Sequence, residues 1–388
     1  MANSSEPGGA VPTVPPVPRQ AQPGFTTPDV VLTPPSTGEG GTRRPERSGW
    51  SDERRVRAEL ARTPPLVLPP QCDRLTAELG QVATGQALLL HGGPGAETSD
   101  DVAGYRLSRE LALVLGHAAC LPVVTVGRVV AGGSDLRRRY RDSARYLDEL
   151  RALVSDPATA DVVRESLDRR LATAPAAARH ADVVALVRSR LAGPHPGPPD
   201  LFVSHEAVLP DYEFALTRTD PRTGRRFGAS GHLLWADDRG RAHLDFLAGV
   251  ENPVAVALGP GSTARATAGL ARRLNPDRVP GRLTFITRLG AGRVRAVLPR
   301  LIDAVADTGV PVGWVCDPLH GNAFTATAGD LGDVVAEVRD FHDAHQAAGT
   351  HAGGLHVELV DDVPADGPRL DRDQALELVL WTAERRAR

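Results

Sequence analysis

Short apolar runs alternate with amphipathic stretches from about residue 86 to the C-terminus. Continuous runs rich in leucine and β-branched residues are typical of parallel strands that are buried on both faces. The stretches between them, such as 262–275 and 292–309, repeat apolar residues at the 3.6-residue period of helices. The eight runs are QALLLHGG (86–93), PVVTVGRV (122–129), LFVSHE (201–206), HLLWADD (232–238), NPVAVALGP (252–260), LTFITRLG (283–290), PVGWVCDP (311–318) and GLHVELV (354–360).

Eight strands separated by helices predict an α/β fold of the (β/α)₈, or TIM-barrel, type. A doubly wound open sheet is the alternative, although no G-x-G-x-x-G motif follows the first run. The Ala- and Arg-rich stretch from about 141 to 198 is much longer than an ordinary crossover. We interpret it as a helical insertion between the second and third strands.

The N-terminal segment differs from the rest of the chain. Residues 1–48 are mostly Pro, Gly, Ser and Thr, a composition that cannot bury enough surface to fold, so we expect a disordered tail. A helical pattern follows over 51–62 and ends before Pro64 and Pro65. We therefore assign residues 49–388 to one barrel domain.

Composition excludes several kinds of function. All 45 basic residues are arginine, so the chain of 388 residues offers no Schiff-base lysine and no Walker lysine. The net charge of −3 argues against a dedicated nucleic-acid binder. With three cysteines at unrelated spacings, no long apolar run and no secretory signal, we expect a cytoplasmic protein without a membrane span.

The carboxyl ends of the predicted strands carry the candidate chemistry, because active sites of such barrels lie at that face. Several arginines there indicate an anionic substrate with phosphate or carboxylate groups, and a His with a Glu could hold a divalent metal. Any one of these residues taken alone is better explained by capping or ion pairing, and only the joint pattern favours a site. The polar residues at or just after the strand ends are His91, Glu97, Arg128, His205, Glu206, Asp238, Arg239, Arg288, Asp317, His320 and Glu358.

Longer motifs carry a resemblance to a known family. The segments 64–75, 204–218, 243–260, 281–302, 314–324 and 349–359 resemble the class II 3-deoxy-D-arabino-heptulosonate 7-phosphate (DAHP) synthases, in order along the chain from about Trp50. Only the stretch 141–198 is weakly similar. The resemblance implies a TIM barrel that condenses phosphoenolpyruvate with erythrose 4-phosphate, using a divalent metal, in the shikimate pathway.

The family's metal ligands are only partly present. They are a Cys in Q-G-G-D-C-A-E, the His of D-P-M-H-G, the Glu of H-x-E and the Asp of D-P-R-L-N. His320 and Glu358 match, which makes them the candidates for catalysis and for binding Mn, Mg or Co. Gly95 stands at the cysteine position and Gly367 at the aspartate position, with Asp366 beside it as the candidate replacement. Losing a thiolate and a carboxylate predicts weak metal binding.

The family's substrate contacts are also partly kept. Arg128, Arg239 and Arg288 match arginines that bind phosphoenolpyruvate, and Asp238 replaces a glutamate. A family lysine is Ala257, and the K-P-R-S motif for the sugar phosphate aligns with 136–139, where arginine alone survives. The substrate-binding candidates are Arg128, Glu206, Asp238, Arg239 and Arg288.

Three hypotheses remain open at this point. The chain is a DAHP synthase-type transferase supplying a shikimate-type or specialised aromatic pathway, an enzyme for another anionic substrate that works without metal, or a non-catalytic homologue that binds phosphoenolpyruvate or a partner. The intact arginines favour binding of phosphoenolpyruvate and a sugar phosphate, and the lost positions favour the other two hypotheses. Because relatives are commonly oligomeric, we expect a homo-oligomer.

Overall fold

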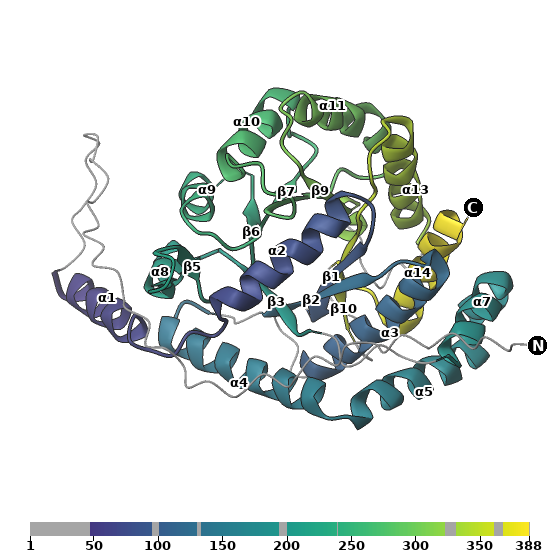
Figure 1. Ribbon diagram of the computed structural model, residues 1–388, viewed down its shortest axis with the longest axis horizontal. Helices are drawn as coiled ribbons and strands as arrows, with labels where there is room; N and C mark the ends of the chain where they lie inside the picture. Colours follow the sequence, from purple (N-terminus) through teal and green to yellow (C-terminus); the bar gives the residue numbers. More distant parts are fainter. Residues whose placement is uncertain are drawn as a thin grey trace, which may run out of the picture.

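The strands close into a barrel. The computed structural model describes residues 47–94, 101–129, 133–193, 200–238, 240–322, 331–360 and 368–387. Within these residues eight parallel strands pair in the closed order β1-β10-β9-β8-β7-β6-β3-β2 (Figure 1). They are β1 (Leu88–Pro94), β2 (Val123–Val129), β3 (Phe202–Glu206), β6 (Leu233–Asp237), β7 (Val254–Leu258), β8 (Leu283–Thr287), β9 (Gly313–Cys316) and β10 (Gly354–Leu359). Each lies in one of the eight apolar runs apart from the last residue of β1, so the TIM-barrel prediction is confirmed.

Helices form a ring around the barrel (Figure 1). The helices predicted over 262–275 and 292–309 are α10 (Ala264–Leu274) and α11 (Val294–Ala306). Their apolar faces join one large core cluster with the outward-facing strand residues. The remaining helices of this ring are α3 (Asp101–Ala119), α8 (Pro210–Ala215), α9 (Arg241–Ala248), α13 (Gly332–Ala347) and α14 (Arg372–Ala387), and the short α12 (Pro318–Gly321) follows β9.

The amino-terminal end of the barrel is closed by α2 (Pro69–Ala83), which lies across the strands in Figure 1. Leu75, Leu79 and Val82 of this helix form one buried cluster with interior strand residues such as Leu89 and Phe202. Because one end is filled by apolar side chains, a ligand must enter from the carboxyl ends of the strands.

The segment between β2 and β3 is helical. It consists of α4 (Leu136–Ser155), α5 (Ala158–Thr173), α6 (Pro175–Arg179) and α7 (Ala181–Leu191). The helical segment begins at 136, ahead of the expected 141, because the Asp135 side chain caps α4 by accepting from the backbone N–H groups of Arg137 and Arg138. The division into a tail and one barrel domain stays a prediction, since residues 1–46 lie outside the described residues.

Two other elements differ from the expectation. The helix predicted over 51–62 is α1 (Arg47–Leu60), and residues 217–228 form a small antiparallel pair, β4 (Thr217–Thr219) with β5 (Arg226–Gly228). Strands of three residues are too short to show a periodic pattern. No helix in the described part of the chain is long and apolar enough to cross a membrane.

Candidate active site

A layer of charged side chains lies on top of an apolar layer inside the barrel. Alternate residues of a strand share one face. Val126, Trp235, Ile286 and Val315 belong to the buried cluster of the interior. The residues two positions further along the chain lie at the carboxyl end of the barrel, in the last strand residues or directly after them. They are Arg128, Asp237, Arg288 and Asp317. The site is therefore built by strand alternation at the barrel mouth.

Arg128 of β2 reaches two carboxylates, one on the adjacent strand β3 and one on β10, which lies beyond β1. It forms a short ion pair with Glu358 of β10, and its guanidinium lies 4.0 Å from Glu206 of β3. The Arg128 side chain is only 7% exposed, and its guanidinium carbon lies 5.4 Å from the centre of the Trp235 ring. Burial raises the pKa of Glu206, although the charge of Arg128 opposes this.

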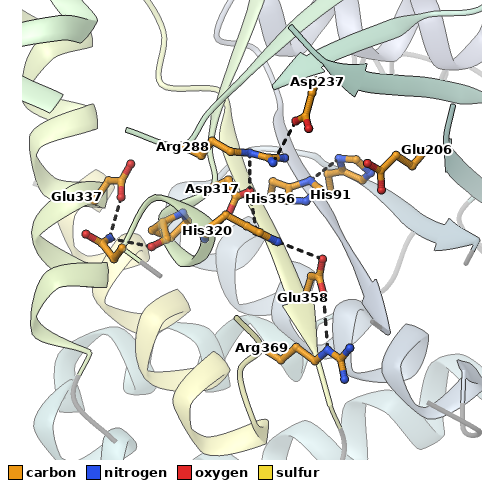
Figure 2. A network of polar contacts seen from close by, with 12 residues as sticks. His91, Glu206, Asp237, Arg288, Asp317, His320, Glu337, His356, Glu358 and Arg369 are labelled. Atoms are coloured by element: carbon orange, nitrogen blue, oxygen red, sulfur yellow. Dashed lines mark hydrogen bonds and ion pairs between the residues drawn. The ribbon is translucent and has the colours of Figure 1, made fainter. Parts of the chain in front are cut away.

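Arg288 is a second cationic group near Trp235, with its guanidinium carbon 5.9 Å from the ring centre. It donates to Asp237 at 3.2 Å and lies 3.4 Å from Asp317, which is fully buried (Figure 2). Arg128 and Arg288 are thus held over one aromatic ring, each by carboxylates. This arrangement fits the binding of a ligand with two anionic groups.

His320 lies between two carboxylates (Figure 2). Its Nδ1 is 3.0 Å from Asp317, and its Nε2 is 3.6 Å from Glu358. Burial disfavours the charged imidazole, but the hydrogen bond to Asp317 and its charge raise the pKa of His320 overall. For Asp317, burial is likewise outweighed by His320 and Arg288, and the pKa is lowered. His320 therefore tends to keep its proton while Asp317 stays ionised.

Other predicted site residues lie elsewhere or cannot be placed. Asp238 accepts a hydrogen bond from the Ser262 hydroxyl at 2.6 Å. The carboxylate that pairs with Arg288 is that of the preceding residue, Asp237. Arg239 and Asp366 lie outside the described residues, as do Glu97, Gly95 and Gly367. Their roles stay predictions.

Two histidines expected near the mouth are buried below or beside it. His91 is fully buried one layer down, where its Nδ1 lies 2.8 Å from Nδ1 of His356 and its Nε2 lies 2.7 Å from the Ser204 hydroxyl. Burial lowers the pKa of His91 to about 3 and that of His356 well below its usual value, so both rings are neutral. His205 instead contacts Glu213 at 2.7 Å, away from the arginines.

Sequence reasoning missed three contributors. Trp235 and Asp237 contact the arginines, and Arg369 lies 3.7 Å from the second oxygen of Glu358 (Figure 2). The alternation of β6 could have identified the first two, because Leu233, Trp235 and Asp237 share a face. Arg369 gave no comparable signal, because it does not end any of the eight apolar runs.

The described donors do not by themselves make a metal centre. His320 Nε2 and Glu358 Oε1 are close enough to share an ion, since ligands about 2.0–2.6 Å from one metal lie about 3–4 Å apart. Glu358, however, is engaged by Arg128 and Arg369, and no three His, Cys, Asp or Glu side chains in the described residues are grouped to hold an ion. The set is therefore incomplete without residues outside the described ranges, such as Asp366.

The position that the resembling family gives to lysine is apolar here. Ala257 is buried in the interior cluster with Trp235, and it offers no charge to the layer of arginines above. Since the sequence has no lysine, the cationic side chains available to an anion at this end of the barrel are arginines and protonated His320.

The fold and the site make the molecule a TIM barrel with two arginines close to one tryptophan ring at its open end. The model of the class-II DAHP synthetase family matches residues 42–138 and 133–366. The chain is 34% identical to a phospho-2-dehydro-3-deoxyheptonate aldolase of Streptomyces coelicolor over 91% of this chain and 98% of that protein. It is 30% identical to the corresponding AroG protein of Mycolicibacterium smegmatis over 87% and 92%. The chain belongs to the class-II DAHP synthetase family.

Proposed function

We propose that this protein is a 3-deoxy-7-phosphoheptulonate synthase-type transferase that condenses phosphoenolpyruvate with erythrose 4-phosphate in aromatic biosynthesis. Arg128 and Arg288 carry the proposal, because they converge over Trp235 at the open end of the barrel in a chain of this family. The alternatives, another anionic substrate or a non-catalytic homologue, receive no support from the relatives.

Arg128 and Arg288 bind the carboxylate and phosphate of phosphoenolpyruvate in this proposal. Each guanidinium is paired with carboxylates in the free protein, so the ligand replaces Glu206 and Asp237 as partners, while Asp317 and Glu358 keep the arginines oriented. In the sequence, Asp238 and Arg239 come directly after the last residue of β6, and we include both among the substrate-binding residues. Charge-assisted pairs of this kind are worth roughly 1.5–3 kcal/mol each.

His320 and Glu358 are the proposed catalytic residues. When C3 of phosphoenolpyruvate attacks the aldehyde carbon, a C–C bond forms and the aldehyde oxygen gains negative charge. His320 can supply a proton from Nε2, because Asp317 at Nδ1 favours the protonated ring. Glu358 lies 3.6 Å from that nitrogen, and its negative charge further raises the pKa of His320. The attack leaves C2 electron-poor, so water adds there and loses a proton. The bond between C2 and the phosphate oxygen then breaks, the C2 hydroxyl loses its proton to give a carbonyl, and inorganic phosphate leaves.

A divalent cation would be held by His320, Glu358 and Asp366. Because a ligating Nε2 carries no proton, His320 donates a proton to the aldehyde oxygen only where no cation is bound at that nitrogen, and a bound cation would itself supply the positive charge there. The described donors are incomplete, and we derive no step through the metal. Because Glu358 is shared with Arg128 and Arg369, we expect the cation to bind more weakly than a site with a thiolate and two carboxylates.

The direct test is an assay of purified protein with phosphoenolpyruvate, erythrose 4-phosphate and Mn²⁺, following release of inorganic phosphate. Calorimetry with phosphoenolpyruvate alone tests the arginine pair separately. Binding without turnover would favour a non-catalytic homologue, and absence of both would refute the proposal.

A further inference from the structure

A buried glutamate joins the two loops that carry Arg288 and His320. We call residues 288–291 the β8 loop and residues 317–322 the β9 loop. Glu337 of α13 is fully buried, and Oε1 accepts from the backbone N–H groups of Leu289 at 2.8 Å and Gly290 at 3.0 Å. Its other oxygen, Oε2, accepts from the side-chain amide of Asn322 at 2.7 Å. One carboxylate thus contacts both loops (Figure 2).

Asn322 completes the junction between the loops. Its Oδ1 accepts from the backbone N–H of Ala291 at 2.9 Å, and its Nδ2 also donates to the Pro318 carbonyl at 2.8 Å. These bonds fix which side of the amide faces Glu337. A rotated Asn322 would present its oxygen to the carboxylate and its nitrogen to the Ala291 N–H, which is unfavourable at both contacts.

The backbone of both loops is shaped to approach this carboxylate closely. Gly290 has φ +84°, and a Cβ there would lie 2.7 Å from the Gly321 carbonyl oxygen. A Cβ on Gly321 would lie 2.7 Å from Oε2 of Glu337. Two glycines therefore allow the loops to meet each other and the carboxylate without side chains between them.

We propose that Glu337 is a positioning residue that holds the β8 and β9 loops in one fixed arrangement, so that Arg288 and His320 act on the same ligand. The proposal rests on the proposed function, because it concerns the phosphoenolpyruvate site. Glu337 touches neither substrate nor reacting atoms, and it acts through the Leu289, Gly290 and Asn322 contacts. The N–H groups of Leu289 and Gly290 donate to one oxygen of Glu337, and the Asn322 amide donates to the other. Because both oxygens accept hydrogen bonds, the ionised carboxylate is the form that holds the two loops.

The charge of Glu337 is costly in this place. Burial raises its pKa to about 7, against the backbone hydrogen bonds from Gly290 and Leu289, which favour the charged form. The titratable groups that face it are Asp317, whose pKa is lowered, and Cys316, whose pKa is raised well above its usual value. Neither of these two changes charge near neutral pH, so titration of the junction itself belongs to Glu337.

Glu337→Gln tests this role, with Asp343→Asn on the same helix as the matched control. The amide introduced by E337Q can still accept at its oxygen, but its nitrogen then faces that of Asn322, donor against donor. We expect the dissociation constant for phosphoenolpyruvate at pH 8 to rise about tenfold or more, as for loss of one charge-assisted hydrogen bond. D343N, whose carboxylate pairs with Arg385 at a partly exposed position, should bind like the unmodified protein.

A compensating variant separates positioning from general stability. In E337Q/N322D the carboxylate introduced at position 322 can accept both from the new amide at position 337 and from the Ala291 N–H, so the contact with position 337 is restored with its polarity reversed. The bond that Asn322 donates to the Pro318 carbonyl is lost, so we expect the double variant to recover part of the affinity that E337Q loses. E337Q should also unfold within about 3 °C of the unmodified protein at pH 8, because removing a buried charge offsets the mismatched contact.

The pH dependence provides a further readout. The quantity to follow is the ratio of the E337Q dissociation constant to that of the unmodified protein, because titration of the substrate phosphate and of His320 affects both proteins alike. This ratio should fall from about ten at pH 8 to near one at pH 6, where Glu337 is protonated. A pH-independent ratio, unchanged affinity in E337Q, or lost affinity with an equal loss of folding and no recovery in the double variant would each overturn the positioning role. If the unmodified protein does not bind phosphoenolpyruvate, the proposed function fails and the positioning role fails with it.

Discussion

Replacing Arg288 by alanine removes one of the two cations over Trp235. In the free protein the Arg288 guanidinium contacts Asp237 and the fully buried Asp317, so the substitution leaves Asp317 with His320 as its remaining cationic partner. We expect the fold to persist for that reason. The pKa of Asp317 should rise, because Arg288 is one of the groups that lower it.

The effect on ligand binding follows from the contacts that disappear. A guanidinium that makes two charge-assisted hydrogen bonds to an anionic group contributes roughly 2–4 kcal/mol, which corresponds to a loss of about 30- to 1000-fold in affinity. Arg288→Lys keeps the charge but not the planar fork, and we expect a loss of about tenfold. Titration calorimetry with phosphoenolpyruvate measures both values. Arg300→Ala, on the exposed side of α11, serves as the control.

A phosphoenolpyruvate affinity that is unchanged in R288A would refute the assignment of this arginine to the substrate. An equal loss in R300A would also refute it, because it would show that net charge rather than the Arg288 contact controls binding.

Three further changes test other parts of the account. Glu358→Gln leaves Arg128 and Arg369 without their shared anion, so we expect a loss of about 3 kcal/mol in the free energy of unfolding, measured with urea, together with loss of turnover. Glu337 has a pKa of about 7 in the folded protein, above its ordinary value of 4.5, so the folded state binds more protons and its stability falls as pH rises to about 7. Between pH 4.5 and 8 the free energy of unfolding of the unmodified protein should therefore fall by about 3 kcal/mol relative to that of E337Q. Urea unfolding measures both values, and an equal pH dependence in the two proteins would contradict this. Metal analysis after equilibration with Mn²⁺ should show weak binding that His320→Ala abolishes, and tight binding retained in H320A would exclude His320 as a ligand.

The barrel could be predicted because its strands are continuous apolar runs with a clear period. Arg128, Glu206, Arg288 and Glu358 could be predicted as neighbours because strand ends meet at one face, and the structure brings these four together with His320. Asp238 stays a predicted substrate-binding residue, while strand alternation places its neighbour Asp237 against Arg288.

Other features depend on contacts that no local pattern encodes. Glu337 lies on a helix and contacts the site only through the β8 and β9 loops, so no motif or strand end in the sequence pointed to it. His91 follows a strand core and was expected at the mouth, yet it is buried against His356 because the β1 and β10 registers align them side by side.

The most direct test of the central claim is the condensation assay itself. With phosphoenolpyruvate, erythrose 4-phosphate and added Mn²⁺, the account predicts one inorganic phosphate released for each 3-deoxy-7-phosphoheptulonate formed. His320→Ala should abolish both products while phosphoenolpyruvate still binds. The claim would be contradicted if the unmodified protein bound phosphoenolpyruvate but formed neither product, or if H320A turned over at the same rate.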